Sequence, residues 1–174
     1  NGVIGISELL LDTELQPRQR HFAQLIRTSA TSLLTLINNL LDFSKIEADK
    51  MALEIEPFDL RGLVDQLLSV SQVTGKRKGL AISARIDAEL APRYQGDAVR
   101  LRQILVNLLG NAVKFTDCGT VELRVECLEQ GKDGDLLRFA VQDSGVGIER
   151  EYLGKLFQPF SQVDSSSTRR SEEH

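Results

Sequence analysis

Apolar residues in the first fifty positions recur at helical spacing. The opening segment NGVIGISELLLDT carries them three and four positions apart, and Pro17 then suits the first turn of a new helix. From Pro17 to about Ala48 the spacing alternates between four and three over three heptads, and only one position breaks the pattern. The seam consists of Phe22, Ile26, Ser29, Leu33, Leu36, Leu40 and Phe43. The pattern predicts an antiparallel helical hairpin.

The predicted apolar stripe is too broad for a two-stranded seam. The residues that widen it are Leu25, Ile37, Leu41 and Ile46. One hairpin cannot bury so wide a stripe alone, so we expect residues 1–50 to form a homodimer, a two-fold four-helix bundle. The alternative is an intramolecular hairpin covered by the rest of the chain, because periodicity reports burial and not the partner.

The apolar period changes after Lys50. The segment MALEIEPF alternates like a strand that stops at Pro57, and Asp59 is placed to cap a helix that begins with LRGLVDQLL. We expect GKRKG to form a charged turn, LAISARI a strand, and APRYQGD a loop that leads into the next helix.

The next helix contains QILVNLLGNAVKFT, and two strands, GTVELRVECL and DLLRFAVQD, follow it with EQGKDG as their hairpin loop. REYLGKLF predicts a short helix. Helices and strands intermingle without strict alternation, which favours an α+β sandwich with one layer of helices over a doubly wound sheet. We expect two domains, 1–50 and 51–170, and a tail, 171–174, that need not be native.

Composition places the chain in the ordinary globular class. Of its 174 residues, 41% are hydrophobic and 26% are charged, and the net charge of −4 gives no reason to expect nucleic acid. No apolar run approaches the roughly 20 residues that span a bilayer. Cys118 and Cys127 do not form a disulfide framework, and no Cys/His spacing suggests zinc. We therefore expect a cytoplasmic domain.

Polar residues interrupt the apolar run QILVNLLGNAVKFT. Asn107, Asn111 and Lys114 fall within about 60° of one another around a helix axis, and Arg100 and Gln103 extend the same stripe. We expect the opposite arc to pack on a sheet; it consists of Leu101, Ile104, Leu105, Leu108, Leu109, Ala112 and Val113.

The chemistry of this stripe suits a metal-bound phosphate. A solvated helix face is the ordinary explanation of a polar stripe, although Glu and Lys would serve it better than asparagine, a weaker helix former. Amide oxygens can ligate Mg²⁺ or its waters, and lysine neutralises phosphate charge. The stripe is therefore a candidate nucleotide-binding surface.

A second candidate segment, QDSGVGI, follows the last predicted strand. Asp143 followed by Gly145 and Gly147 lets the backbone turn sharply and approach a flat ligand closely. A carboxylate there can accept a hydrogen bond from the exocyclic amine of adenine. An ordinary turn is the alternative, because Asp-Ser-Gly is common in turns.

The third candidate segment is LFQPFSQVDSSSTRR. Phe157 and Phe160 flank a proline, and a serine-rich run that ends in Arg169 and Arg170 follows them. Such a segment could form a mobile flap that is anchored by aromatic residues and whose arginines reach phosphate. A helix end with a frayed tail is the alternative.

Taken in order, these segments resemble the motifs of the sensor histidine kinases. NLLGNAVKFT resembles their N box, DSGVGI their first glycine box, and LFQPFSQVDSSSTRR their F box and the start of the ATP lid. NGVIGISELLL and LLTLINNLLDFSKIEADKM resemble the dimerisation and phosphotransfer hairpin of the hybrid-type kinases. The likeness covers residues 1–170, and four motifs in the family's order make it specific.

The resemblance implies a Bergerat-type α/β sandwich, shared with gyrase, HSP90 and MutL, that holds ATP and Mg²⁺ between the asparagine helix and the lid. It implies that Asn111 ligates Mg²⁺, that Asn107 and Lys114 contact metal or phosphate, and that Asp143 binds the adenine amine. The other nucleotide-binding positions that it implies are Phe115, Gly145, Gly147, Phe157, Phe160, Arg169 and Arg170.

The chain departs from the family pattern at both ends. The family's phosphoacceptor histidine would precede Asn1, and His21 lies on the second helix, where we expect a bundle-surface residue instead. SEEH replaces the second glycine box that should follow TRR. We therefore expect either a chain truncated at both ends or one that omits segments, and we expect no autophosphorylation from the chain as it stands.

The resemblance implies the core of a histidine kinase that transfers the γ-phosphoryl group of ATP to a histidine, for relay to the receiver aspartate of a response regulator. Its parent protein could be anchored in the inner membrane, as is common in the family. A non-catalytic dimerising regulator of other kinases is the alternative. A gyrase- or HSP90-like ATPase ranks third, because those families place a carboxylate near the first asparagine and QILVNLLGNAVKFT contains none.

Overall fold

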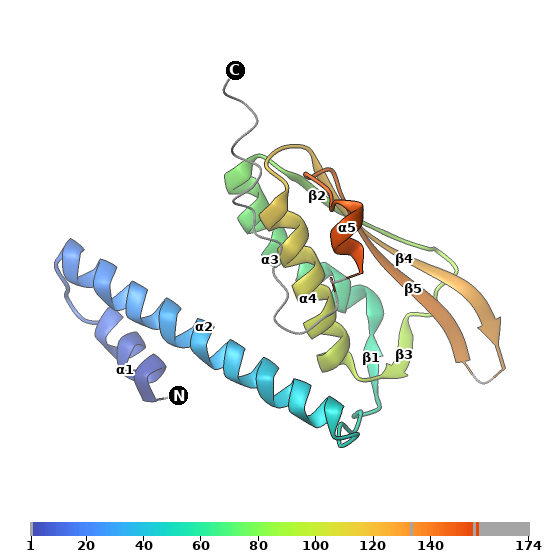
Figure 1. The fold of residues 1–174 in the computed structure, drawn as a ribbon, viewed down its shortest axis with the longest axis horizontal. Helices are drawn as coiled ribbons and strands as arrows, with labels where there is room; N and C mark the ends of the chain where they lie inside the picture. The colour runs from blue at the N-terminus through green and yellow to red at the C-terminus, as the bar shows by residue number, and fades with distance from the viewer. Residues whose placement is uncertain (1, 133, 155, 157–174) are drawn as a thin grey trace. The chain divides into compact units, whose positions relative to one another are not determined.

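The computed structural model describes residues 2–132, 134–154 and 156. The chain divides into two compact units, Asn1–Leu53 and Glu54–His174. In Figure 1 the first unit runs from dark blue to cyan and the second from green to orange. Among the described residues, no helix combines the length and the apolar character that a membrane span requires.

The first unit is the helical hairpin that the heptad pattern predicts. Its helices are α1 (Gly2–Leu11) and α2 (Pro17–Glu47), joined by a short loop (Figure 1). Pro17 occupies the first turn of α2, where its missing N–H leaves no hydrogen bond unmade. Gln16 and Gln19 cap the same turn reciprocally. The predicted start of the second helix is thus confirmed.

The hairpin alone does not bury its apolar seam. Within the described part of this unit only Ser7 and Ala23 are buried. Leu33 and Leu36, which lie on the predicted seam, are 59% and 65% exposed, and Phe22 is 49% exposed. Apolar area of this extent is stabilised only when another surface covers it.

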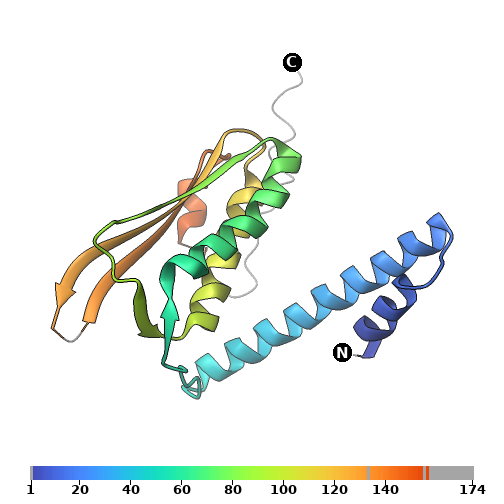
Figure 2. The same cartoon turned by 180° about the vertical axis from the view of Figure 1, so that it is seen from behind.

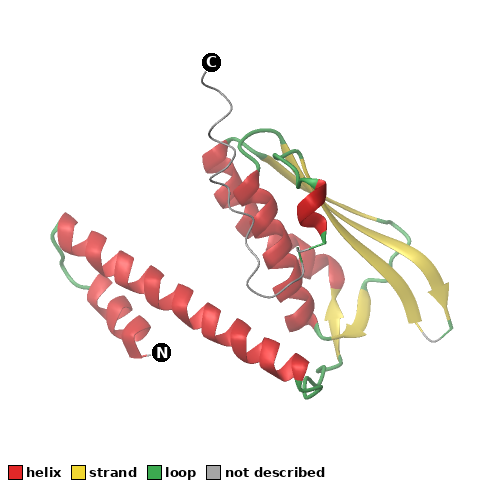
Figure 3. Ribbon diagram, in the orientation of Figure 1, coloured by secondary structure: helices red, strands yellow, loops and turns green. Residues whose placement is uncertain are grey.

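The second unit is a sandwich of helices on one face of a sheet. Its elements are β1 (Glu56–Asp59), α3 (Leu60–Lys78), β2 (Ala81–Ile86), β3 (Arg93–Gly96), α4 (Ala98–Phe115), β4 (Thr120–Gly131), β5 (Gly134–Asp143) and α5 (Arg150–Leu153). β2 pairs with β4 in parallel and β4 pairs with β5 antiparallel, while β1 and β3 form a separate two-stranded sheet. α3 and α4 lie side by side against one face of the larger sheet (Figures 2 and 3).

The core of this unit lies between the two long helices and the sheet. Alternate residues of β4 point into it, and Val121, Leu123 and Val125 are each 0% exposed. The helices contribute Leu60, Leu63, Val64, Leu67, Leu105, Leu109, Ala112 and Val113. The predicted fold class, a helical hairpin followed by an α/β sandwich with one helix layer, is confirmed.

The predicted turn at GKRKG is wrong, because α3 continues through it to Lys78. A Cβ on Gly75 would lie 2.3 Å from Ile82 Cδ1, so the glycine allows α3 to pack closely on β2 instead of breaking the helix. Gly79, at φ 73°, adopts the left-handed conformation and ends the helix.

The strand boundaries near residue 55 also differ from the prediction. The strand predicted from MALEIEPF begins only at Glu56, and the loop predicted from APRYQGD contains β3. These two short strands pair with each other antiparallel, with Phe58 opposite Tyr94. Each depends on a partner distant in the sequence, which a local apolar pattern does not reveal.

Candidate functional site

Helix α4 presents the predicted polar stripe to solvent. Asn107, Asn111 and Lys114 are all exposed. The buried side of the same helix consists of Leu105, Leu109, Ala112 and Val113. In the part of the chain that the structure describes, neither asparagine amide takes part in a hydrogen bond. Both amides are therefore available to a ligand.

The packed arc of α4 is narrower than predicted. Ile104 and Leu108, which were expected to face the sheet, are 55% and 42% exposed. Ile104 lies about 100° around the axis from Leu105, outside the arc that the sheet and α3 cover. Apolar surface therefore borders the polar stripe on one side.

Asp97 fixes the beginning of α4. Its Oδ1 accepts a hydrogen bond from the Arg100 backbone N–H at 2.9 Å, and its Oδ2 accepts one from the Glu54 N–H at 3.2 Å. The Arg100 bond is the main reason that the pKa of Asp97 lies below its ordinary value. The helix that carries the stripe is thus anchored at its N-terminus.

The structure places the glycine loop, residues 143–147, directly on the C-terminal end of α4. The Val146 N–H donates to the Phe115 carbonyl at 3.4 Å. A Cβ on Gly145 would lie 2.4 Å from that same carbonyl oxygen, so only glycine permits this approach. Gly147 has φ 70°, the left-handed conformation that favours glycine. The glycine loop therefore contacts the same helix that carries the polar stripe, at its C-terminal end.

Ser144 ties the loop to the start of β4. Its N–H donates to the Thr120 carbonyl at 3.1 Å, and its Oγ accepts from the Thr120 N–H at 2.9 Å. The loop is thus held from two sides, by β4 and by α4. Contacts within the protein therefore fix the position of its backbone.

Asp143 is the first residue of this loop, and a hydrogen bond within the loop orients its carboxylate. Its Oδ1 accepts a hydrogen bond from the Gly145 N–H at 2.9 Å, while the residue as a whole is exposed. No described residue donates to Oδ2. One oxygen thus orients the carboxylate, and the other can accept a hydrogen bond from a ligand amine.

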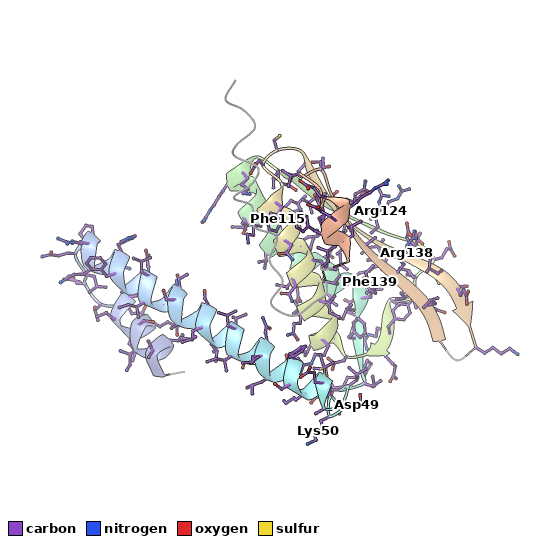
Figure 4. All side chains as sticks on the ribbon, viewed as in Figure 1. Asp49, Lys50, Phe115, Arg124, Arg138 and Phe139 are labelled. Carbon is purple, nitrogen blue, oxygen red and sulfur yellow. The ribbon has the colours of Figure 1, made fainter. Side chains whose placement is uncertain are left out.

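Lys114, the last residue of the stripe, and Phe115 lie at the end of α4 that the glycine loop contacts. The Lys114 Nζ lies 4.8 Å from the centroid of the Phe115 ring, a cation–π contact. Phe115 is 47% exposed, and Figure 4 labels it at the end of α4 near the glycine loop. Cation, aromatic face and carboxylate are therefore brought to one end of the helix.

Two residues beside the site were not singled out from the sequence. Lys78 donates from Nζ to the carbonyl oxygens of Val113 and Lys114 at 2.9 and 3.0 Å. Thr116 is 0% exposed, and its Oγ1 has no hydrogen-bond partner among the described residues. A cation in the last turn of a helix is a recognisable C-terminal signal, but nothing in the sequence marks a buried hydroxyl.

Phe157, Phe160, Arg169 and Arg170, which the sequence analysis assigned to the lid, lie outside the described residues. Across 2–132, 134–154 and 156, no three His, Cys, Asp or Glu side chains cluster as a metal site would require. A cation at the stripe would therefore depend on amide oxygens and on the phosphates of its own ligand, which is how Mg²⁺ is commonly bound beside nucleotides.

The residues that are present fit a magnesium nucleotide. The exposed amides of Asn107 and Asn111 are hard oxygen donors, and Lys114 adds positive charge one turn further along α4. A Cβ on Gly145 would lie 2.9 Å from Asp143 Oδ1, so the glycine keeps the loop free of a side chain beside that carboxylate. The fold is thus a helical hairpin followed by an α/β sandwich domain that carries a candidate nucleotide site.

Comparison with protein families finds one match at each end of the chain. Residues 1–49 match the His Kinase A (phospho-acceptor) domain. Residues 96–174 match the histidine kinase-, DNA gyrase B- and HSP90-like ATPase domain. The chain therefore belongs to the sensor histidine kinases, and the predicted resemblance is confirmed.

Similar proteins occur in Escherichia coli and in Dictyostelium discoideum. The chain is 41% identical over 170 residues to the signal transduction histidine-protein kinase BarA of Escherichia coli, covering 98% of this chain and 18% of BarA. It is 40% identical over 172 residues to the hybrid signal transduction protein dokA of Dictyostelium discoideum, covering 98% of this chain and 10% of dokA. The chain thus spans less than a fifth of the length of either relative.

Solved structures of histidine kinases share the fold. Full-length ShkA in complex with AMPPNP matches with a TM-score of 0.76 and 35% identity, over 94% of this chain and 34% of ShkA. ThkA in complex with the response regulator protein TrrA matches with a TM-score of 0.61, over 92% of this chain and 46% of ThkA. At 22% identity the ThkA likeness supports the fold alone.

Proposed function

We propose that this chain is the catalytic core of a sensor histidine kinase that uses ATP with Mg²⁺. The second unit binds the nucleotide, and the γ-phosphoryl group passes to a histidine of the His Kinase A domain. From there it passes to the aspartate of a receiver domain in a response regulator. These steps belong to the parent protein.

The observation that carries this proposal is the contact between the glycine loop and the end of α4. The Val146 N–H donates to the Phe115 carbonyl, and the loop that makes this contact also carries Asp143, whose Oδ1 accepts from the Gly145 N–H. This contact supports a single ligand that meets both the loop and the end of α4. Asp143 accepts a hydrogen bond from the adenine amine, and the loop backbone at Gly145 and Gly147 borders the base. Asn107 and Asn111 face the phosphates. The AMPPNP-bound ShkA structure, 35% identical to this chain, supports the same class of ligand.

Catalysis in this site is a matter of position and charge. Phosphoryl transfer requires little covalent chemistry from the protein, so the enzyme gains most by holding the triphosphate in line and neutralising its charge. The Asn111 and Asn107 amides would hold Mg²⁺, and the ion would neutralise charge on the phosphates. Lys114 adds a mobile cation that can leave the Phe115 ring for a phosphate oxygen.

Isothermal titration calorimetry of the 174-residue chain with AMPPNP tests this proposal. We expect binding that requires Mg²⁺ and that weakens at least about tenfold in Asn111→Ala. Asn38→Ala, an exposed asparagine of α2, is the matched control and should bind like the unaltered chain. A folded chain that gives no heat with AMPPNP and Mg²⁺ would contradict the kinase function and favour the alternative, a non-catalytic dimerising regulator.

The first unit supports the second part of the proposal, a homodimer through residues 1–50. Leu33, Leu36 and Phe22 expose about half or more of their area in the single hairpin. A second copy that packs on this seam completes a four-helix bundle and buries these side chains. Sedimentation equilibrium measures this directly: a two-chain mass supports the bundle, and a single-chain mass at micromolar concentration contradicts it.

A further inference from the structure

The ammonium of Lys78 holds together the carbonyl end of α4. Its Nζ donates to the carbonyl oxygens of Val113 at 2.9 Å, Lys114 at 3.0 Å and Thr116 at 3.2 Å. A lysine has three N–H donors, so these three bonds use all of them. The Asp117 carboxylate lies 3.8 Å away and is 92% exposed, so it adds little.

Among the residues that the structure describes, no other side chain caps the carbonyl end of α4 in this way. The last carbonyls of any helix lack partners within the helix, and a left-handed glycine commonly supplies them from the backbone. The residue after α4 is Thr116, whose φ of −107° and ψ of 119° are extended. The Val146 N–H serves the Phe115 carbonyl, and Lys78 serves the carbonyls on either side of it. Its positive charge also suits the negative end of the helix dipole.

Lys78 is itself held in place. It is the last residue of α3, and Gly79 ends that helix in the left-handed conformation. The Leu80 N–H donates to the Gly75 carbonyl at 3.0 Å, which closes the cap. Gly75 packs α3 on Ile82 of β2. The ammonium therefore reaches α4 from a fixed base instead of from a free helix end.

The turn that Lys78 clamps is the turn that carries the candidate site. Lys114 and Phe115 project from it, and the loop 143–147 rests on the Phe115 carbonyl. If the carbonyls of this turn lose their donors, the turn frays and both sides of the site shift. We propose that Lys78 is a positioning residue for nucleotide binding, one that acts through the end of α4 without touching the nucleotide.

This inference rests on the proposed nucleotide-binding function, so its test needs separate readouts. Lys78→Met keeps most of the apolar stem and removes the ammonium. Lys76→Met, an exposed lysine of the same helix turn, is the matched charge control. Lys78→Arg keeps the charge but replaces the three-way ammonium with a planar fork. All three are made in the full 174-residue chain.

The dissociation constant for AMPPNP with Mg²⁺ should rise about tenfold in Lys78→Met and by less in Lys78→Arg, and stay unchanged in Lys76→Met. Adenosine, titrated by NMR, should lose affinity by a similar factor, because positioning affects the base and phosphate sides alike. A loss confined to AMPPNP would show that Lys78 contacts phosphate directly and would overturn the positioning role. So would Lys78→Met binding at the unaltered affinity.

Hydrogen exchange separates this inference from the proposed function and does not depend on nucleotide. In the unaltered chain, the amides of residues 112–115 should be as protected as those in the middle of α4. They should exchange at least about tenfold faster in Lys78→Met at equal urea midpoint. If Lys78→Met does not fold, fast exchange of these amides in the unaltered chain still contradicts the clamp. An unaltered chain that binds no nucleotide but shows the protected turn would refute the proposed function and with it the positioning role, and would leave only the clamp on α4.

Discussion

Gly145→Ala tests the contact between the glycine loop and α4. The added methyl would lie 2.4 Å from the Phe115 carbonyl oxygen and 2.9 Å from Asp143 Oδ1. Carbon–oxygen contacts are comfortable only from about 3.3 Å, so the loop must retreat by roughly 1 Å from backbone that cannot yield cheaply. This retreat lengthens the 3.4 Å bond from Val146 to Phe115, which is already long.

The expected loss of nucleotide affinity in Gly145→Ala follows from overpacking and from the weakened hydrogen bond together. Overpacking costs about 1–3 kcal/mol, and a weakened hydrogen bond costs about 0.5–1.5 kcal/mol. Because the loop is exposed and can move away, part of this cost is relieved, and we expect about 2 kcal/mol to appear as lost ligand affinity. That corresponds to roughly a thirtyfold higher dissociation constant for AMPPNP with Mg²⁺.

Calorimetry with AMPPNP measures the loss of nucleotide affinity, and urea unfolding measures the change in the free energy of unfolding. Gly110→Ala is the matched control, because nothing lies within 4 Å of its added Cβ and the residue is an exposed position within α4. It should raise the free energy of unfolding by up to about 1 kcal/mol through helix propensity. Equal nucleotide affinity in Gly145→Ala and the unaltered chain would refute the close approach of loop and helix.

Three further changes probe the site, the helix cap and the hairpin. Asp143→Asn keeps an oxygen acceptor for the Gly145 N–H but loses the charge. Its dissociation constant for AMPPNP, measured by calorimetry, should rise about tenfold while the urea midpoint stays unchanged. An unchanged dissociation constant contradicts the adenine role. The pKa of Asp97 is lowered, mainly by the Arg100 N–H, so its contribution is complete above the ordinary value of 3.8 and is lost as the pH falls through the lower folded value. Urea unfolding between about pH 5 and pH 2 should show this loss, and Asp97→Asn should reduce it. Leu36→Glu, which changes a seam residue that is 65% exposed, should shift sedimentation toward single chains, and an undiminished dimer would place the interface elsewhere.

Local signals in the sequence located most elements of the fold. Pro17 marks the start of α2, and Asp59 caps α3 through a bond from the Gly62 N–H, as its side chain predicts. The alternation of GTVELRVECL predicts which face of β4 is buried, because strand side chains alternate between faces. These features depend on neighbouring residues, so a single sequence reveals them.

Features that depend on distant contacts escaped prediction. Gly75 looks like a turn residue until Ile82 is placed against it, and β3 exists only because β1 pairs with it. Ile104 appears to be a core residue from its spacing, yet 55% of it stays exposed because the sheet covers a narrower arc.

The candidate site likewise has one part that the sequence predicts and another that depends on distant contacts. The polar stripe of α4 follows from helical spacing, whereas its meeting with the loop 143–147 depends on the end of β5 reaching the end of α4. Lys78 illustrates the limit most clearly, since its three carbonyl partners lie 35 to 38 residues away in the chain.

An NMR titration of the 174-residue chain with AMPPNP and Mg²⁺ locates the ligand directly. If the stripe and the glycine loop form one nucleotide site, the largest amide shifts will fall in residues 107–116 and 143–147. Amides of α2 in the first unit will serve as the internal reference and stay in place. Saturable binding that shifts other residues and leaves both segments unmoved would contradict the assignment of this site.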